Sequence, residues 1–303
     1  MSYQHHHHHE NHHHHDIHAT TTRAFIIGII LNSSFVLAET IAGLLNNSLA
    51  LLTDAGHNLL DVAGLVLVIV ANKFAKKKPT QKYTYGYGKT TILVALTNAT
   101  LLMIAVGAIG WEAVGRIAEP QPVQGKIIAL VSILGIIINT ISAFLFMKDK
   151  AKDLNVKGAY LHMASDALIS LGVTLSGIII IYTNWFWLDS VISLAIIIVI
   201  VLSTWGLLKD SLRLSLDGVP EGINTEKIRE YLLSLKGVKG LHDLHIWAMS
   251  TNATALTAHL VAPEGIDDSF LAEINEELHH HFNIDHTTIQ IEKSADIGCE
   301  QKC

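Results

Sequence analysis

The sequence of 303 residues contains few cysteines and few charged residues. Its two cysteines, Cys299 and Cys303, both lie at the C-terminal end. This excludes a fold held together by a framework of disulfides, and in a cytoplasmic tail such a pair indicates metal binding rather than oxidation. Charged residues make up 16% of the chain and hydrophobic residues 50%, so the sequence is too apolar for an ordinary soluble protein.

An excess of basic charge, which nucleic-acid-binding proteins typically have, is also missing. The net charge is −6, which leaves no basic footprint for a nucleic-acid partner. The N-terminus is polar, unlike the apolar core of a secretory signal peptide. Histidines fill positions 5–9 and 12–15, and His18 follows. Two interpretations stay open: a purification tag, or a native His-rich tail over residues 1–22 that collects metal ions with low affinity.

Six apolar segments follow, each long enough to cross a bilayer core, which takes about 20 helical residues. They cover residues 24–44, 49–72, 91–114, 126–147, 158–182 and 187–208. Lysines concentrate in the links at 73–89 and 148–157, and lysine-rich links face the cytoplasm. The sequence therefore predicts an α-helical membrane protein with six transmembrane helices over residues 23–212 and both termini in the cytoplasm.

Two of these segments carry a histidine and an aspartate four residues apart, His57 with Asp61 and His162 with Asp166. Positions i and i+4 share one face of a helix, so each pair points one way. The two segments run in opposite directions. A rise of about 1.5 Å per residue places Asp61 near the depth of His162, and His57 near that of Asp166, close to the membrane midplane.

Two imidazoles and two carboxylates form a ligand set that suits tetrahedral Zn²⁺, with cobalt, nickel and cadmium as other candidate ions. Zinc needs neutral imidazole and ionised carboxylate, so its binding releases protons. A site that opens alternately to each side therefore exchanges Zn²⁺ for H⁺. Three alternatives stay open: a proton relay without metal, a membrane sensor that binds zinc without transporting it, and an intramembrane metalloenzyme. Against the last, the sequence contains no HExxH motif.

After Arg213 the composition becomes that of a soluble segment. Periodicity predicts helices at 225–235 and 267–282, and strands at 241–249, 255–261 and 287–292. The order α-β-β-α-β over residues 213–293 predicts a small α/β sandwich with one sheet face covered. A tail over residues 294–303 then carries the two cysteines. Residues of metal-ligand type lie on the strands or their ends: His242, His245, His259, Asp285, His286 and Glu292.

Between about residues 24 and 292 the chain resembles the cation diffusion facilitator family, close to its bacterial zinc exporters and to eukaryotic zinc transporters. The motifs that carry the resemblance are 47–61, 83–89, 162–166, 241–247 and 288–292. The resemblance implies a homodimeric metal/proton antiporter rather than an enzyme, with a metallochaperone-like cytoplasmic domain and no organic cofactor. Its partners are then Zn²⁺, H⁺, the lipid bilayer of a bacterial inner membrane and a second copy of the chain.

The resemblance also implies two metal sites. The transport site falls on two histidines and two aspartates: His57, Asp61, His162 and Asp166. A cytoplasmic site, at which zinc acts as a regulatory ligand, falls on strand residues and on a cysteine pair that some relatives share: His242, His259, Glu292, Cys299 and Cys303. The sequence departs from some bacterial members at Gln290, where they carry a histidine that bridges two ions. The full binuclear cytoplasmic site is therefore not expected.

Overall fold

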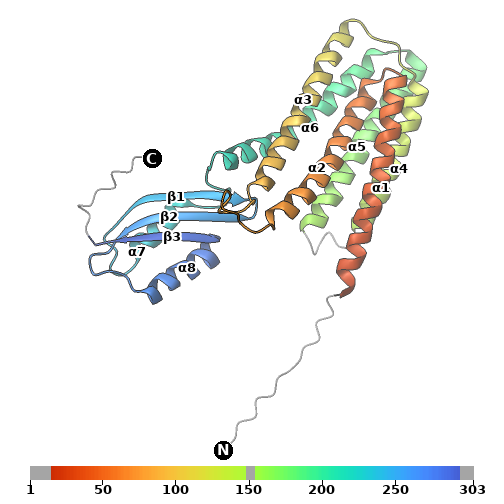
Figure 1. The fold of residues 1–303 in the computed structure, drawn as a ribbon. Helices are drawn as coiled ribbons and strands as arrows, with labels where there is room; N and C mark the ends of the chain where they lie inside the picture. The colour runs from red at the N-terminus through yellow and green to blue at the C-terminus, as the bar shows by residue number, and fades with distance from the viewer. Residues whose placement is uncertain (1–14, 148–153, 294–303) are drawn as a thin grey trace, which may run out of the picture. The chain divides into compact units, whose positions relative to one another are not determined.

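The structure is a computed structural model, and it describes residues 15–147 and 154–293 (Figure 1). Six long helices occupy the positions of the six apolar segments: α1 (His15–Leu45), α2 (Leu49–Ala75), α3 (Thr90–Ala118), α4 (Gly125–Met147), α5 (Leu154–Thr183) and α6 (Trp187–Ser215). Helices α2 to α6 are long and apolar enough to span a membrane, and Ile30–Leu45 of α1 forms a shorter apolar helix among the residues searched. The predicted helical membrane domain is confirmed.

The helices extend beyond the apolar segments at several ends. Helix α1 begins at His15, inside the expected His-rich tail, whose residues 1–14 lie outside the described ranges. The chain divides into two compact units, residues 1–62 with 105–199, and residues 63–104 with 200–303. The divisions fall within α2, α3 and α6, so each unit is described by itself.

In the first unit, α4 packs along α5 and α1. Glycines allow the backbones of α4 and α5 to approach closely. A Cβ atom on Gly177 would lie 2.8 Å from the backbone nitrogen of Ala129, and one on Gly125 would lie 2.6 Å from the carbonyl oxygen of Gly177. Small residues at such crossings strengthen van der Waals packing between membrane helices, where lipid offers no hydrophobic drive for association. Helix α5, which bears His162 and Asp166, is thereby held against α4.

The start of α2 is fixed by a carboxylate from the start of α6. Asp189 is 1% exposed and accepts hydrogen bonds from the backbone N–H of Leu49 and the hydroxyl of Ser48, each at 2.6 Å. The first N–H groups of a helix lack partners within the helix, and its dipole favours an anion there. Asp189 therefore anchors the helix that carries His57 and Asp61.

The second unit contains the α/β domain. Its elements are α7 (Thr225–Ser234), β1 (Gly240–Ser250), β2 (Ala253–Val261), α8 (Asp268–Phe282) and β3 (His286–Glu292). The sheet has the order β1-β2-β3, with β1 antiparallel to β2 and β2 parallel to β3. Helices α7 and α8 lie on one face of this sheet (Figure 1). The predicted α-β-β-α-β order is confirmed.

The core of this domain lies between the sheet and its two helices. Fully buried apolar residues from three elements fill it: Ile228 and Leu232 of α7, Ile274 and Leu278 of α8, and Leu256, Ala258 and Leu260 of β2. Successive side chains of a strand point to opposite faces, so His259 of β2 points away from this core. The face of the sheet opposite the two helices therefore presents His259 and its neighbours.

Candidate metal centres

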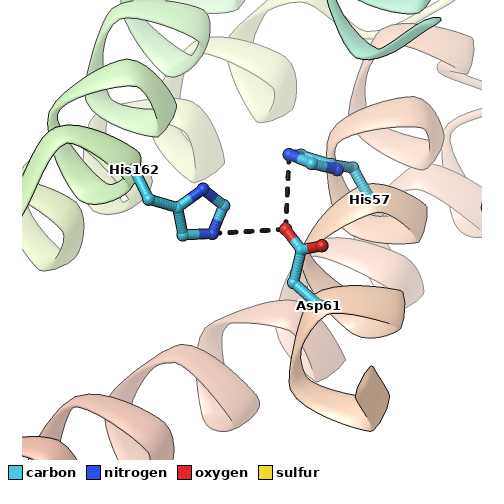
Figure 2. A group of neighbouring side chains, drawn as sticks. All are labelled: His57, Asp61 and His162. Carbon is cyan, nitrogen blue, oxygen red and sulfur yellow. Dashed lines mark ion pairs between the residues drawn. The ribbon is translucent and has the colours of Figure 1, made fainter. Parts of the chain in front are cut away.

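Four side chains from α2 and α5 meet inside the first unit. Oδ2 of Asp61 lies 3.4 Å from Nε2 of His57 and 3.2 Å from Nε2 of His162 (Figure 2). The carboxylate of Asp166 lies 3.9 Å from Nε2 of His57 and 3.6 Å from Nε2 of His162. The structure thus brings together all four residues of the expected transport site.

Three of these four separations are longer than the hydrogen bonds that such atoms usually form. Histidine nitrogens and carboxylate oxygens bind Zn²⁺ at about 2.0–2.2 Å, so ligand atoms at tetrahedral angles lie about 3.3–3.5 Å apart. Hydrogen bonds between such atoms are about 2.7–3.2 Å long. The four nitrogen–oxygen distances run from 3.2 to 3.9 Å. One ligand atom from each of His57, Asp61 and His162 lies within 4.8 Å of the other two, a spacing that suits a shared metal ion, and Asp166 adjoins this group.

Several polar atoms of this cluster have no hydrogen-bond partner. Both carboxylate oxygens of Asp166, Oδ2 of Asp61 and Nδ1 of His57 are buried, and none makes a hydrogen bond within the described part of the chain. The side chain of Asp166 is only 1% exposed. Buried charges in proteins are generally paired or bound to metal, because an unpaired buried carboxylate is costly. A divalent cation would satisfy the carboxylate oxygens of Asp61 and Asp166.

On the face of the sheet opposite α7 and α8, three of the expected ligands meet. Oε2 of Glu292 lies 2.9 Å from Nε2 of His242, and Oε1 of Glu292 lies 2.9 Å from Nδ1 of His259. The two histidines are paired across β1 and β2. The hydrogen bond with His242 holds the pKa of the Glu292 carboxyl below its usual range, so this carboxyl is ionised at neutral pH. The other two expected ligands, Cys299 and Cys303, lie outside the described residues.

Asp243, which was not among the expected ligands, also joins this cluster. It lies at a bulge in β1 with a φ of +54°, and its carboxylate lies 2.9 Å from Nε2 of His245 and 3.5 Å from Nε2 of His259. A bulge re-aims side chains that strict alternation would place on the other face. The one available signal was an aspartate, a residue that tolerates positive φ, inside a strand pattern. Gln290 also reaches the cluster, where its Nε2 donates to Oε1 of Glu292 at 3.2 Å.

Comparisons with known proteins cover nearly the whole chain. Residues 25–214 match the family described as the cation efflux transmembrane domain, and residues 220–294 match ZT_dimer, described as the cytoplasmic domain of cation efflux proteins. The chain is 38% identical over 265 residues to the zinc transporter ZitB of Pectobacterium atrosepticum, covering 87% of this chain and 83% of the relative. It is 35% identical over 279 residues to the cadmium, cobalt and zinc/H(+)-K(+) antiporter of Bacillus subtilis, covering 90% and 89%.

A solved structure was also found, the metal-bound C-terminal domain of the CzcD transporter from Cuprividus metallidurans. It is 35% identical in sequence and covers 23% of this chain and 99% of that chain, with a TM-score of 0.22.

Proposed function

The chain belongs to the cation diffusion facilitator family of zinc transporters, and we propose that it exports Zn²⁺ from the cytoplasm in exchange for protons. It is a multi-pass membrane protein for cation efflux and not an enzyme. Membership of a cation efflux family argues against the two alternatives of a zinc sensor and an intramembrane metalloenzyme. The observation that supports the zinc assignment is the meeting of two histidines and two aspartates from α2 and α5 within 4 Å of one another's nitrogens and oxygens.

The chemistry of this ligand set couples zinc to protons. Imidazole nitrogens favour zinc over harder ions such as magnesium and manganese. Zinc binds only the neutral imidazoles and the ionised carboxylates, so metal and protons compete for the same four side chains. Zinc that enters from the cytoplasm displaces protons, and protons that enter from the other side displace zinc. An inward proton gradient thus drives zinc outward. The Bacillus subtilis relative, which is named as an antiporter that uses H⁺, supports this coupling.

The proposed organisation follows the expectations from the sequence. A His-rich tail (1–22) precedes the membrane domain (23–212), the cytoplasmic α/β domain (213–293) and a cysteine-containing tail (294–303). The lysine-rich links support a cytoplasmic position for both termini. The membrane is then the inner membrane of a bacterium. The match of the cytoplasmic domain to ZT_dimer supports a homodimer. The cluster of His242, His259 and Glu292 is then a second, regulatory zinc site.

Zinc uptake into inside-out membrane vesicles tests this proposal. Under a proton gradient that is acid inside, vesicles with the native protein accumulate zinc, whereas vesicles with Asp61→Asn or Asp166→Asn accumulate no more than empty ones. A matched control is Asp210→Asn, an exposed carboxylate of α6 that pairs with Arg213, and this variant keeps native uptake. Native uptake by both site variants would remove the α2–α5 cluster as the transport site.

A further inference from the structure

A second acidic pair lies inside the membrane domain, and the proposed zinc site does not use it. Glu39 of α1 and Asp54 of α2 are both 0% exposed. Their carboxyl groups are close enough to interact with each other. Neither oxygen of Glu39 has an N–H or hydroxyl donor among the residues that the structure describes. A buried carboxyl group therefore faces another carboxyl group without any compensating donor.

The hydrogen bonds around the pair show where a proton belongs. An ionised carboxylate only accepts hydrogen bonds, so two carboxyl groups bond to each other only if one holds a proton. Asp54 accepts hydrogen bonds from Nδ2 of Asn58 at 3.2 Å and from Oγ of Ser170 at 3.4 Å, as a carboxylate does. Glu39 accepts no hydrogen bond within the described residues, which is expected of a neutral carboxylic acid whose O–H donates to Asp54. Two ionised carboxylates in contact and out of water would repel strongly.

The pair is connected to the transport site through both ligand-bearing helices. Asp54 lies three residues before His57 on α2, and its donor Ser170 lies four residues after Asp166 on α5. The charge of Asp166 also acts on Glu39. Entry of Zn²⁺ beside Asp166 adds positive charge to this neighbourhood, which favours the ionised form of a nearby carboxyl group.

Helix α4 and residues 30–45 of α1 add no further acidic residue or histidine to this neighbourhood. Helix α4, which packs along α1, carries no acidic residue or histidine, and its one charged residue is Lys126 at its first turn. Between Ile30 and Leu45 of α1, Glu39 is the one charged residue. Helices α2 and α5 also carry His57, Asp61 and His162, and the groups on these helices that act on Glu39 are Asp54 and Asp166.

We propose that Glu39 is a proton-binding site of the transporter, separate from the zinc ligands. This inference rests on the proposed exchange of zinc for protons. As Zn²⁺ binds, one proton leaves the Glu39 carboxyl group for water and a carboxylate remains. As Zn²⁺ leaves, a proton from water returns to Glu39. Bound zinc lowers the affinity of Glu39 for its proton, and the bound proton lowers the affinity for zinc by the same factor. Each zinc ion therefore displaces one proton in addition to those released by its own ligands.

The variant Glu39→Gln tests the proposal, because glutamine keeps the size and donates an N–H to Asp54 but cannot ionise. Protons released per zinc bound are measured on the full chain by calorimetry in buffers of different ionisation enthalpy. Native protein is expected to release about one proton more per zinc than Glu39→Gln. The slope of log Kd for zinc against pH is expected to be steeper in the native protein than in the variant, by up to about one. The control Glu112→Gln removes a carboxylate that is 55% exposed and pairs with Arg116, and it keeps native proton release.

Equal proton release by native protein and Glu39→Gln would overturn the proposal and leave Glu39 as a structural hydrogen-bond donor. Loss of a bound zinc ion from Glu39→Gln would also overturn it, since the pair would then hold metal. Either result leaves the zinc/proton exchange standing if Asp166→Asn still abolishes transport. A different result would contradict the exchange itself: zinc flux by the native protein without any counter-movement of protons.

A second measurement needs no variant, in case Glu39→Gln does not fold. Infrared difference spectra of native protein with isotope-labelled glutamate report protonated glutamate side chains specifically. The proposed ligands inside the membrane domain are histidines and aspartates, and Glu292 is already ionised at neutral pH. Zinc is expected to remove the carbonyl band of one buried, labelled glutamic acid. Persistence of that band after zinc binding would overturn the proposal.

Discussion

Oδ2 of Asp61 on α2 lies 3.2 Å from Nε2 of His162 on α5, and this contact joins two helices that are far apart in the sequence. Neither helix supplies more than two of the four proposed ligands, so zinc affinity depends on the distance between α2 and α5. A small separation of the two helices would take the ligands out of reach of one ion. The same dependence gives an alternating-access transporter a means of releasing its cargo.

Removal of one carboxylate from the site should cost most of the zinc affinity. In Asp166→Asn the amide replaces an ionised oxygen ligand with a neutral one, and we expect zinc binding at the transport site to weaken by more than about 100-fold. The measurement is a zinc titration of the purified full chain. Because Asp210 is exposed and lies outside the cluster, Asp210→Asn should bind zinc like the native protein. Native affinity in Asp166→Asn would show that this carboxylate is not a ligand.

Close packing of α4 on α5 should not tolerate a methyl group at Gly177. A Cβ atom there would lie 2.8 Å from the backbone nitrogen of Ala129, and backbone cannot move aside as a flexible side chain can. We expect Gly177→Ala to lower the thermal stability of the protein in detergent and to reduce transport, since α5 carries two of the proposed ligands. Gly172→Ala is the matched control on the same helix, because its Cβ meets no atom within 4 Å. Equal melting temperatures for the two variants would contradict this account of the packing.

The cytoplasmic cluster should bind zinc independently of the transport site. In the background of Asp166→Asn, a zinc titration reports mainly the cluster of His242, His259 and Glu292. There we expect Glu292→Gln to weaken zinc binding by about tenfold or more, because it removes the ionised carboxylate that both histidines contact. The control Glu276→Gln changes a carboxylate that is 76% exposed on α8. Unchanged binding in Glu292→Gln would exclude this residue as a ligand.

The cap of α8 should make the cytoplasmic domain sensitive to acid. The carboxylate of Asp267 accepts the backbone N–H of Phe270 at 2.8 Å, and this bond holds the pKa of Asp267 below its usual value. The stability that this hydrogen bond gives to the folded domain is fully present above the carboxyl pKa of the unfolded chain, about 3.9. It is lost as the pH falls through the lower pKa of the folded chain.

We therefore expect Asp267→Ala to lower the melting temperature of the domain by roughly 2–5 °C at neutral pH, and this difference to shrink below about pH 4. The measurement is thermal unfolding followed from pH 7 to pH 3. Asp267→Asn keeps an accepting oxygen at the cap without a titrating group, so its stability should vary less with pH than that of the native protein. A difference between native protein and Asp267→Ala that persists at the lowest pH would contradict this reasoning.

Local periodicity predicted the elements well, because helices and strands follow patterns of neighbouring residues. The span expected at 126–147 is helix α4, Gly125–Met147, and the strand expected at 255–261 is β2, Ala253–Val261. The four expected transport-site residues do meet in the structure. Their meeting was predictable because the i, i+4 spacing fixes each face and the span lengths fix each depth.

Contacts that depend on tertiary packing were not predictable in this way. Asp189 caps α2 across 140 residues, and no local pattern assigns a carboxylate to the start of another helix. Asp243 reaches the cytoplasmic cluster through a bulge, which breaks the alternation that sequence analysis relies on. The interaction of Glu39 on α1 with Asp54 on α2 likewise depends on where the tertiary structure places residues of two different helices.

Simultaneous measurement of zinc and protons tests the central claim most directly. Proteoliposomes that contain the full chain are loaded with zinc and a pH-sensitive dye, and zinc efflux is started while both ions are followed. The account predicts that protons enter as zinc leaves, and that Asp61→Asn abolishes both movements while Asp210→Asn alters neither. Zinc efflux without proton entry, or efflux by Asp61→Asn at the native rate, would contradict it.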